Sequence, residues 1–139
     1  MMHHPLLFKR VHRVHHLSTN PSPLAAYSFH PFEAVVEALF FPVIILLVPV
    51  HFSVIVAFVV IDLGYNVLGH LGHELYPKGF TSHPIGKWNN TSTHHNMHHR
   101  YFNANYGLYF NVWDRICGTN HARYEATFER VVHRRDASN

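Results

Sequence analysis

The chain has 139 residues, of which 47% are hydrophobic and only 14% are charged. This length limits it to one domain with a modest core, and the composition suits a membrane-associated protein better than a soluble one. The formal net charge is +3 at pH 7, but the sequence contains no recognition-helix or aromatic-platform motif, so we expect no nucleic-acid partner.

The first element in chain order is a basic segment, residues 1–17, which carries a cluster of three histidines. On a helix, positions i, i+3 and i+4 share one face, and neutral imidazoles on that face can share a metal ion. Apolar residues at helical spacing would pack on the other side. We call this the His12 cluster: His12, His15 and His16.

The second element is a long apolar stretch that begins near Pro31. The 24 residues from 38 to 61 contain no Asp, Glu, Lys or Arg, which exceeds the roughly 18 residues expected of a membrane span. Pro42 should kink the first part of the stretch, and Pro49 should divide it into two helical arms. The sequence therefore allows either one kinked span or a hairpin of two.

Topology decides between these alternatives. A single span would separate the histidines on either side of the stretch by the bilayer thickness of about 30 Å, whereas metal–imidazole bonds are only about 2 Å long. If the histidines serve one site, they lie on one side of the membrane, and a hairpin over about residues 32–70 is expected. All Lys and Arg residues lie at positions 9–13 or 78–135, so the positive-inside tendency places both ends in the cytoplasm.

The second arm should continue as a helix through residues 66–74, so that His70 and His73 face together, and end at Tyr76-Pro77. After a polar connection, Ser92 or Thr93 is expected to cap a helix. That helix carries the His95 cluster: His95, His98 and His99.

The two clusters favour a metal centre held by nitrogen atoms. The single cysteine excludes an internal disulfide, a multi-cysteine zinc site and a thiolate-held iron–sulfur cluster. A structural zinc site would use four ligands and not eight or more histidines. Composition bias or a chelating tag is the alternative, but the histidines form no uninterrupted run. Two iron ions that bind dioxygen at a membrane surface fit this pattern, with Zn²⁺ as an in vitro occupant.

Several segments resemble the fatty acid hydroxylase and sterol desaturase superfamily, and the likeness covers nearly the whole chain. They are His3-His4-Pro5 through His12-Arg13-Val14-His15-His16, Gly69-His70-Leu71-Gly72-His73-Glu74, His83-Pro84, His94-His95-Asn96-Met97-His98-His99, Asn105-Tyr106-Gly107 and Trp113-Asp114 through Gly118-Thr119.

The resemblance implies an all-α, integral-membrane, O2-dependent enzyme that hydroxylates or desaturates a sterol, fatty acyl chain, carotenoid or related lipid. Its two iron ions would lie in a histidine-rich helical cap on the cytosolic face of the membrane hairpin or bundle. The ligands carried over are His3, His12, His15, His16, His70, His95, His98 and His99. Lipid would enter from the bilayer, and electrons would come from a separate reductase or carrier.

The resemblance has two gaps. The superfamily's first box has a histidine that would fall just before Met1, so residues 1–139 are expected to be the carboxy-terminal part of a single domain of this type. Asn66 stands where some relatives have a ligand. An inactive truncated fragment, or a membrane metal-binding protein without catalytic activity, is therefore the alternative function.

Four further residues are candidates for the site. His30, His73 and His83 either complete a ligand set, hydrogen-bond to a ligand, or lie on the surface. Asp114 either orients a ligating histidine through that histidine's other ring nitrogen or pairs with Arg115 or another cation.

Overall fold

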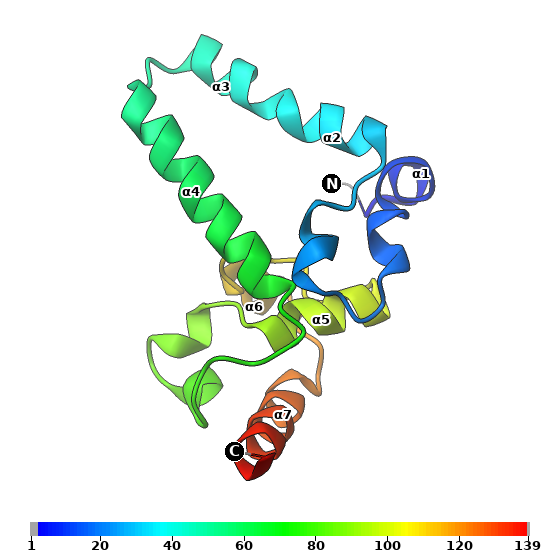
Figure 1. The fold of residues 1–139 in the computed structure, drawn as a ribbon, viewed down its shortest axis with the longest axis vertical. Helices are drawn as coiled ribbons and strands as arrows, with labels where there is room; N and C mark the ends of the chain where they lie inside the picture. The colour runs from blue at the N-terminus through cyan, green and yellow to red at the C-terminus, as the bar shows by residue number, and fades with distance from the viewer. Residues whose placement is uncertain (1–2, 139) are drawn as a thin grey trace.

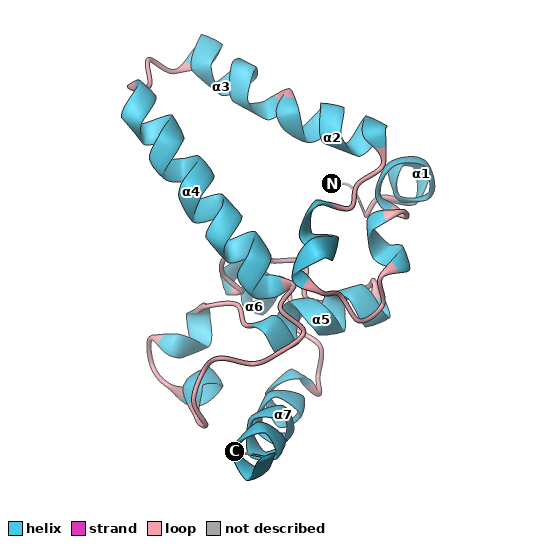
Figure 2. Ribbon diagram, viewed as in Figure 1, coloured by secondary structure: helices cyan, strands magenta, loops and turns pink. Residues whose placement is uncertain are grey.

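The structure is a computed structural model, and it describes residues 3–138. Within that range the expectation of an all-helical protein is confirmed, and extended pairing is confined to one bridge between Asn89 and Phe110. The helices labelled in Figure 1, drawn in cyan in Figure 2, are α1 (Pro5–Leu7), α2 (Pro31–Ala38), α3 (Phe40–Leu47), α4 (Phe52–Gly69), α5 (Ser92–Tyr101), α6 (Val112–Ile116) and α7 (Tyr124–Ser138).

Shorter helical turns connect these elements. A π-helical turn covers Phe8–His12, where a regular α-helix was expected. Turns of the 3₁₀ type cover His15–Leu17, Pro23–Tyr27, Phe80–Ser82 and Gly86–Trp88. The amino-terminal histidines therefore lie on two short turns of different pitch.

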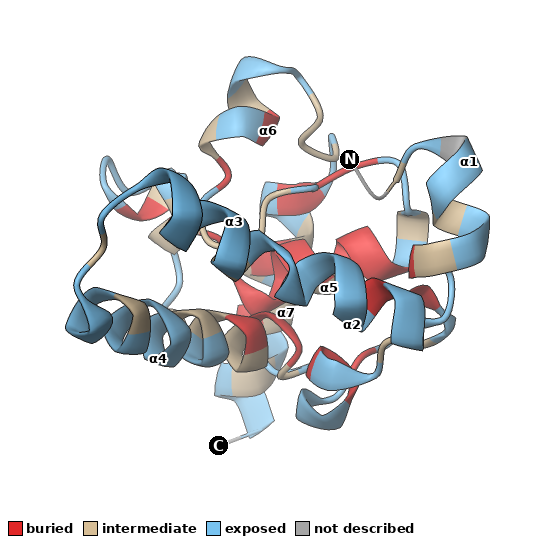
Figure 3. Cartoon of the chain, turned by 90° about the horizontal axis from the view of Figure 1, so that it is seen from above, coloured by how far each residue is buried: buried red, intermediate tan, exposed pale blue. Residues whose placement is uncertain are grey.

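Two apolar arms extend away from the rest of the molecule. One arm consists of α2 and α3 end to end, the other is α4, and residues 48–51 join them at the tip (Figure 1). Side chains of the two arms meet at Phe41 and Phe58, whose ring centroids are 5.6 Å apart. Most residues of both arms are exposed, as the pale blue segments in Figure 3 show.

The exposed apolar surface of these arms is typical of a membrane protein, because soluble monomers rarely expose apolar patches of this size. In residues 3–138, α4 is the one helix long and apolar enough to cross a membrane. Its 18 residues correspond to about 27 Å, close to the thickness of the hydrocarbon core. The other arm consists of two shorter helices, α2 and α3, so a membrane hairpin remains a prediction.

Prolines determine where the arms break. Pro42 has no N–H to donate to the carbonyl of Ala38, and α2 accordingly ends at that residue. Val48, which precedes Pro49, has extended backbone angles, as residues before proline favour, and it ends α3. His51 then caps α4, because its Nδ1 accepts the backbone N–H of Ser53 at 3.2 Å. The expected division at Pro49 is confirmed.

The expected continuation of the second arm through residue 74 is wrong. Helix α4 ends at Gly69, and the chain turns at Gly72, which has a φ of 65°. A side chain there would also come within 2.9 Å of the Pro21 carbonyl oxygen, so the turn depends on glycine. His70 and His73 therefore do not share a helical face.

The base of the molecule is built around α5. Its residue Met97 packs against Tyr124, Phe128 and Val132, which lie at helical spacing on one face of α7. The cap of α5 is Thr91, whose hydroxyl accepts the N–H of His94 at 3.1 Å, and not Ser92 or Thr93 as expected. Figure 3 shows buried residues concentrated on α5 and the segments around it.

Candidate metal centre

Eight histidines converge next to α5 in two groups of four. Within each group, the ring nitrogens that face one another all lie within 4.8 Å. The eight are the same residues that the sequence resemblance selects as ligands. The first histidine group is His3, His12, His16 and His98, and the second histidine group is His15, His70, His95 and His99.

The groups do not follow the sequence clusters. We expected each cluster to gather its three imidazoles in one volume, but each group takes residues from both clusters. His15 separates from its neighbour His16 because consecutive residues of a 3₁₀ turn point about 120° apart. The groups adjoin each other, with the ring centroids of His16 and His99 4.7 Å apart.

Backbone carbonyls orient three of the rings. Nδ1 of His70 lies 2.7 Å from the Asn66 oxygen, and Nδ1 of His98 lies 2.7 Å from the Ala104 oxygen. Nδ1 of His99 lies 3.0 Å from the oxygen of Ser18. A carbonyl can only accept, so Nδ1 carries the proton in each neutral ring, and Nε2 presents a lone pair. These are orientations typical of metal-binding histidines.

The Nε2 atoms of the second histidine group face one another at short distances. They are 3.1 Å apart for His70 and His95, and 3.2 Å for each of the pairs His70–His99, His95–His99 and His15–His70. In the first histidine group, Nε2 of His3 and Nε2 of His16 are 3.0 Å apart.

These spacings fit a bound metal ion. Nitrogen ligands about 2.0–2.1 Å from one metal lie about 3.0–3.4 Å from each other. His70 and His99 both present lone pairs, which repel at 3.2 Å unless a cation lies between them. The donor set is therefore suited to a metal with imidazole ligands, such as iron, copper, nickel or zinc.

A proton is a poor substitute for that cation. Burial, with repulsion from neighbouring histidines, lowers the pKa of His3 and of His15 to about 3. Within the two histidine groups, burial also lowers the pKa of five further rings: His16, His70, His95, His98 and His99. At neutral pH these rings are uncharged and available as ligands.

The surrounding helices bring the rings this close. Gly69, the last residue of α4, allows the ring of His95 to pack against the backbone, since a Cβ at Gly69 would lie 3.3 Å from that ring. At the start of α5, the Glu74 carboxylate accepts the backbone N–H of Thr93 at 3.0 Å and its hydroxyl at 2.7 Å. Both contacts fix α5, which carries three of the eight rings.

Glu33 is a residue of the site that sequence reasoning missed. It is fully buried on α2, and its carboxylate contacts Nδ1 of His12. That contact directs the other ring nitrogen of His12 toward the first histidine group, as carboxylates commonly do at metal sites. In the sequence, an acid in the first turn of a helix indicates only a helix start, and the burial of Glu33 that marks its role is visible only in the structure.

Three further candidates lie outside both groups. His30 caps α2 by accepting the N–H of Phe32 at 3.2 Å, and His83 accepts the N–H groups of Ile85 and Gly86. His73 is exposed and lines a hollow of about 430 Å³ on the opposite side of α5. This hollow is also lined by four arginines: Arg100, Arg123, Arg130 and Arg134.

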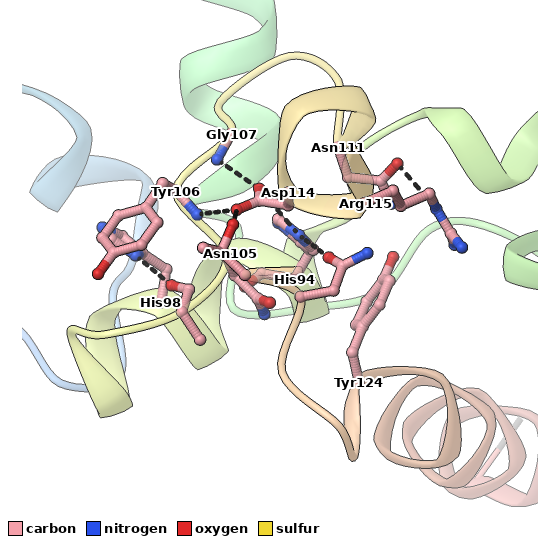
Figure 4. A network of polar contacts seen from close by, with 12 residues as sticks. His94, His98, Asn105, Tyr106, Gly107, Asn111, Asp114, Arg115 and Tyr124 are labelled. Atoms are coloured by element: carbon pink, nitrogen blue, oxygen red, sulfur yellow. Dashed lines mark hydrogen bonds and ion pairs between the residues drawn. The ribbon is translucent and has the colours of Figure 1, made fainter. Parts of the chain in front are cut away.

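Asp114 lies in a buried network of its own, shown in Figure 4. Its carboxylate accepts the N–H groups of Tyr106 and Gly107, and it lies 3.7 Å from Nε2 of His94. Arg115 pairs with Glu125 at 3.3 Å. The histidine beside Asp114 is thus His94, a fully buried ring that belongs to neither group.

Known proteins resemble this chain over most of its length. The lathosterol oxidase of Mus musculus is 32% identical over 128 residues, which are 92% of this chain and 40% of that protein. The Delta(7)-sterol 5(6)-desaturase of Leptosphaeria maculans is 33% identical over 131 residues, 94% of this chain and 35% of that protein. The chain thus spans at most about two fifths of these relatives' length. No solved structure matches it.

The family assignment agrees with the histidine geometry. The model of the family described as fatty acid hydroxylase matches residues 1–119, a range that includes all eight clustered histidines. This match covers far more than half of the chain. The chain therefore belongs to the fatty acid hydroxylase family.

Proposed function

We propose that the protein is a membrane-bound, O2-dependent lipid oxidoreductase that holds two iron ions, one in each histidine group. The observation that carries this proposal is the convergence of eight largely buried imidazoles in two adjoining groups of four. The relatives' names, an oxidase and a desaturase, support oxidative chemistry on sterols. Hydroxylation and desaturation both remain within the proposal.

Iron is preferred among the metals that imidazole binds. Zinc fits the same ligands but has no redox chemistry, so it would act only as an occupant in vitro. Bound iron would activate dioxygen, so that an unreactive C–H bond of the lipid can be oxidised. The residues of this chain hold the ligands in place: Glu33 orients His12, and the Asn66, Ala104 and Ser18 carbonyls hold the Nδ1 protons of His70, His98 and His99.

The membrane arms favour a lipid substrate that arrives from the bilayer. Helix α4 leads from the tip of the arms directly to His70 of the second histidine group (Figure 1). The arms therefore connect a lipid environment with the metal ligands. The charge pattern of the sequence supports a position of this end of the molecule on the cytoplasmic face of the membrane.

Electrons would come from a separate reductase or carrier. The chain has a single cysteine and no Gly-x-Gly-x-x-Gly motif for a dinucleotide. The arginine-lined hollow beside α5 would attract an acidic donor, and it lies across this helix from the histidines. No nucleic acid takes part in the proposed reaction.

The test uses the protein in membranes, loaded with iron and supplied with a reductant and a sterol that carries a Δ7 double bond. We expect about two irons per chain, oxygen consumption that depends on lipid, and an oxidised lipid product. A His98→Ala variant should lose the product, and a His51→Ala variant at the tip of the arms is the matched control. Firm retention of zinc without oxygen consumption would contradict the proposal and favour a metal-binding protein without catalytic activity.

A further inference from the structure

A short loop after α5 contacts the first histidine group at two points. The carbonyl oxygen of Ala104 accepts the Nδ1 proton of His98 at 2.7 Å. The ring of Tyr106 packs against the rings of His3 and His98, with centroids 5.1 Å and 5.6 Å apart. The position of this loop, residues 104–107, therefore sets the position of two rings in that group.

Asp114 holds the loop from the other side. Its carboxylate oxygens accept the backbone N–H of Tyr106 at 2.9 Å and that of Gly107 at 2.7 Å (Figure 4). The same carboxylate accepts the hydroxyl of Thr119 at 2.6 Å. Asp114 is only 1% exposed, so each of these charge-assisted hydrogen bonds is shielded from water and strong.

The loop backbone is shaped for this contact. A Cβ at Gly107 would lie 3.0 Å from the Asp114 carboxylate and 2.4 Å from the carbonyl oxygen of Phe110, so only glycine allows the close approach. Asn105 has a φ of 58°, and its side chain donates to the carbonyl of His94 at 3.0 Å. These contacts restrict the loop to a conformation that reaches Asp114.

Contacts of the loop with the histidine groups fall on one group only. Ala104 and Tyr106 touch His98 and His3, and neither makes a hydrogen bond or ring contact with the second histidine group in the described part of the chain. Two rings of the second histidine group, His70 and His99, are oriented instead by the carbonyls of Asn66 and Ser18. A change in the loop should therefore act on one metal position more than on the other.

We propose that Asp114 is a positioning residue for the first histidine group. It fixes the loop whose Ala104 carbonyl holds the tautomer and orientation of His98, and it thereby raises metal affinity at that group selectively. The proposal rests on the two-metal function proposed above. Asp114 acts through the backbone of residues 104–107, which differs from the direct contact with a ligating histidine that the sequence suggested.

The test is a titration of the metal-free, full-length protein in detergent with Co²⁺, followed by its visible absorption. Wild type should bind two equivalents. In Asp114→Asn one equivalent should bind about 10- to 100-fold more weakly, and the other should be unchanged. Asp136→Asn, an exposed aspartate on α7, is the matched control and should bind as wild type.

A double-mutant cycle separates positioning from general destabilisation. If Asp114 acts through His98, Asp114→Asn should cause no further loss of affinity in a His98→Ala background. Gly107→Ala, which displaces the same loop, should reproduce the selective loss, and Thr119→Val should give a smaller loss of the same kind. If the Asp114→Asn variant does not fold, Gly107→Ala and Thr119→Val take its place in the titration.

Three results would overturn the inference: unchanged Co²⁺ affinities in Asp114→Asn and Gly107→Ala, equal weakening of both equivalents, or full additivity with His98→Ala. A wild-type stoichiometry below two would contradict the proposed two-metal function itself. Two equivalents in wild type with no effect of Asp114→Asn would contradict only the role of Asp114.

Discussion

The arms and the base of this molecule use opposite means to hold their structure. The large apolar residues of the arms, such as Leu46 and Phe52, are mostly exposed. The base buries polar residues, among them seven clustered histidines and Asp114, and its apolar core is small. The comparison teaches that the arms gain little from packing within the chain, as expected of segments that lie in lipid, whereas the base depends on packing around α5 and on ordered polar contacts.

The largest expected effect is in the apolar core of the base. Phe128→Ala on α7 should lower the free energy of unfolding by about 3–5 kcal/mol, because a fully buried ring is replaced by a cavity. Phe52→Ala on α4 removes a ring that is 74% exposed and should change the stability little in detergent. Chemical unfolding of both variants measures the difference, and equal losses would contradict the contrast between the two regions.

A charge in the arms should affect insertion into the membrane. Val60→Arg, at the middle of α4, should disfavour insertion by about 2.5–3.5 kcal/mol, since the side chain would lie near the bilayer centre. Ala137→Arg on α7 is the matched control and should have no effect. The measurement is the fraction of protein that resists alkaline extraction from membranes. Full resistance of Val60→Arg would contradict a position of residue 60 near the bilayer centre.

Removal of the Glu33 carboxylate should weaken metal binding without breaking the fold. Glu33→Gln keeps the shape of the side chain but loses the charge that orients His12, so affinity at the first histidine group should fall about 10- to 100-fold. Glu37→Gln, on the exposed side of the same helix, is the control. Metal titration measures both, and an equal response would remove Glu33 from the site.

Acid should destabilise the metal-free base. The pKa values of His3 and His15 are about 3 in the folded protein, below the ordinary value of 6.5, so the unfolded chain binds more protons below that pH. The contribution of these two neutral rings to the free energy of unfolding is fully present above about pH 6.5 and is lost as the pH falls toward 3. For the buried ring of His15, the loss at pH 5 is at most about 2 kcal/mol. Unfolding midpoints at pH 7.5 and 5 measure the loss, and His15→Phe should reduce it.

The sequence predicted the organisation of the fold better than its local detail. The all-helical class is confirmed. The break at Pro49 is also confirmed, because proline cannot donate the N–H that a continuous helix requires. The continuation of the second arm to residue 74 is wrong, because the turn at Gly72 depends on a close approach to Pro21, far away in sequence. Local propensity carries no information about such a contact.

By itself, the sequence determined which stretch is too apolar for water, and its resemblance to a known family selected eight of the sixteen histidines as candidate ligands. Hydropathy decides the first and the residue order of the motifs decides the second, so neither needs knowledge of a contact elsewhere in the chain. Only the tertiary structure decided that each histidine group combines residues from both clusters, that Glu33 contacts His12, and that Asp114 reaches the site through a loop. These relations join segments on different helices, so they exist only once the chain has packed around α5.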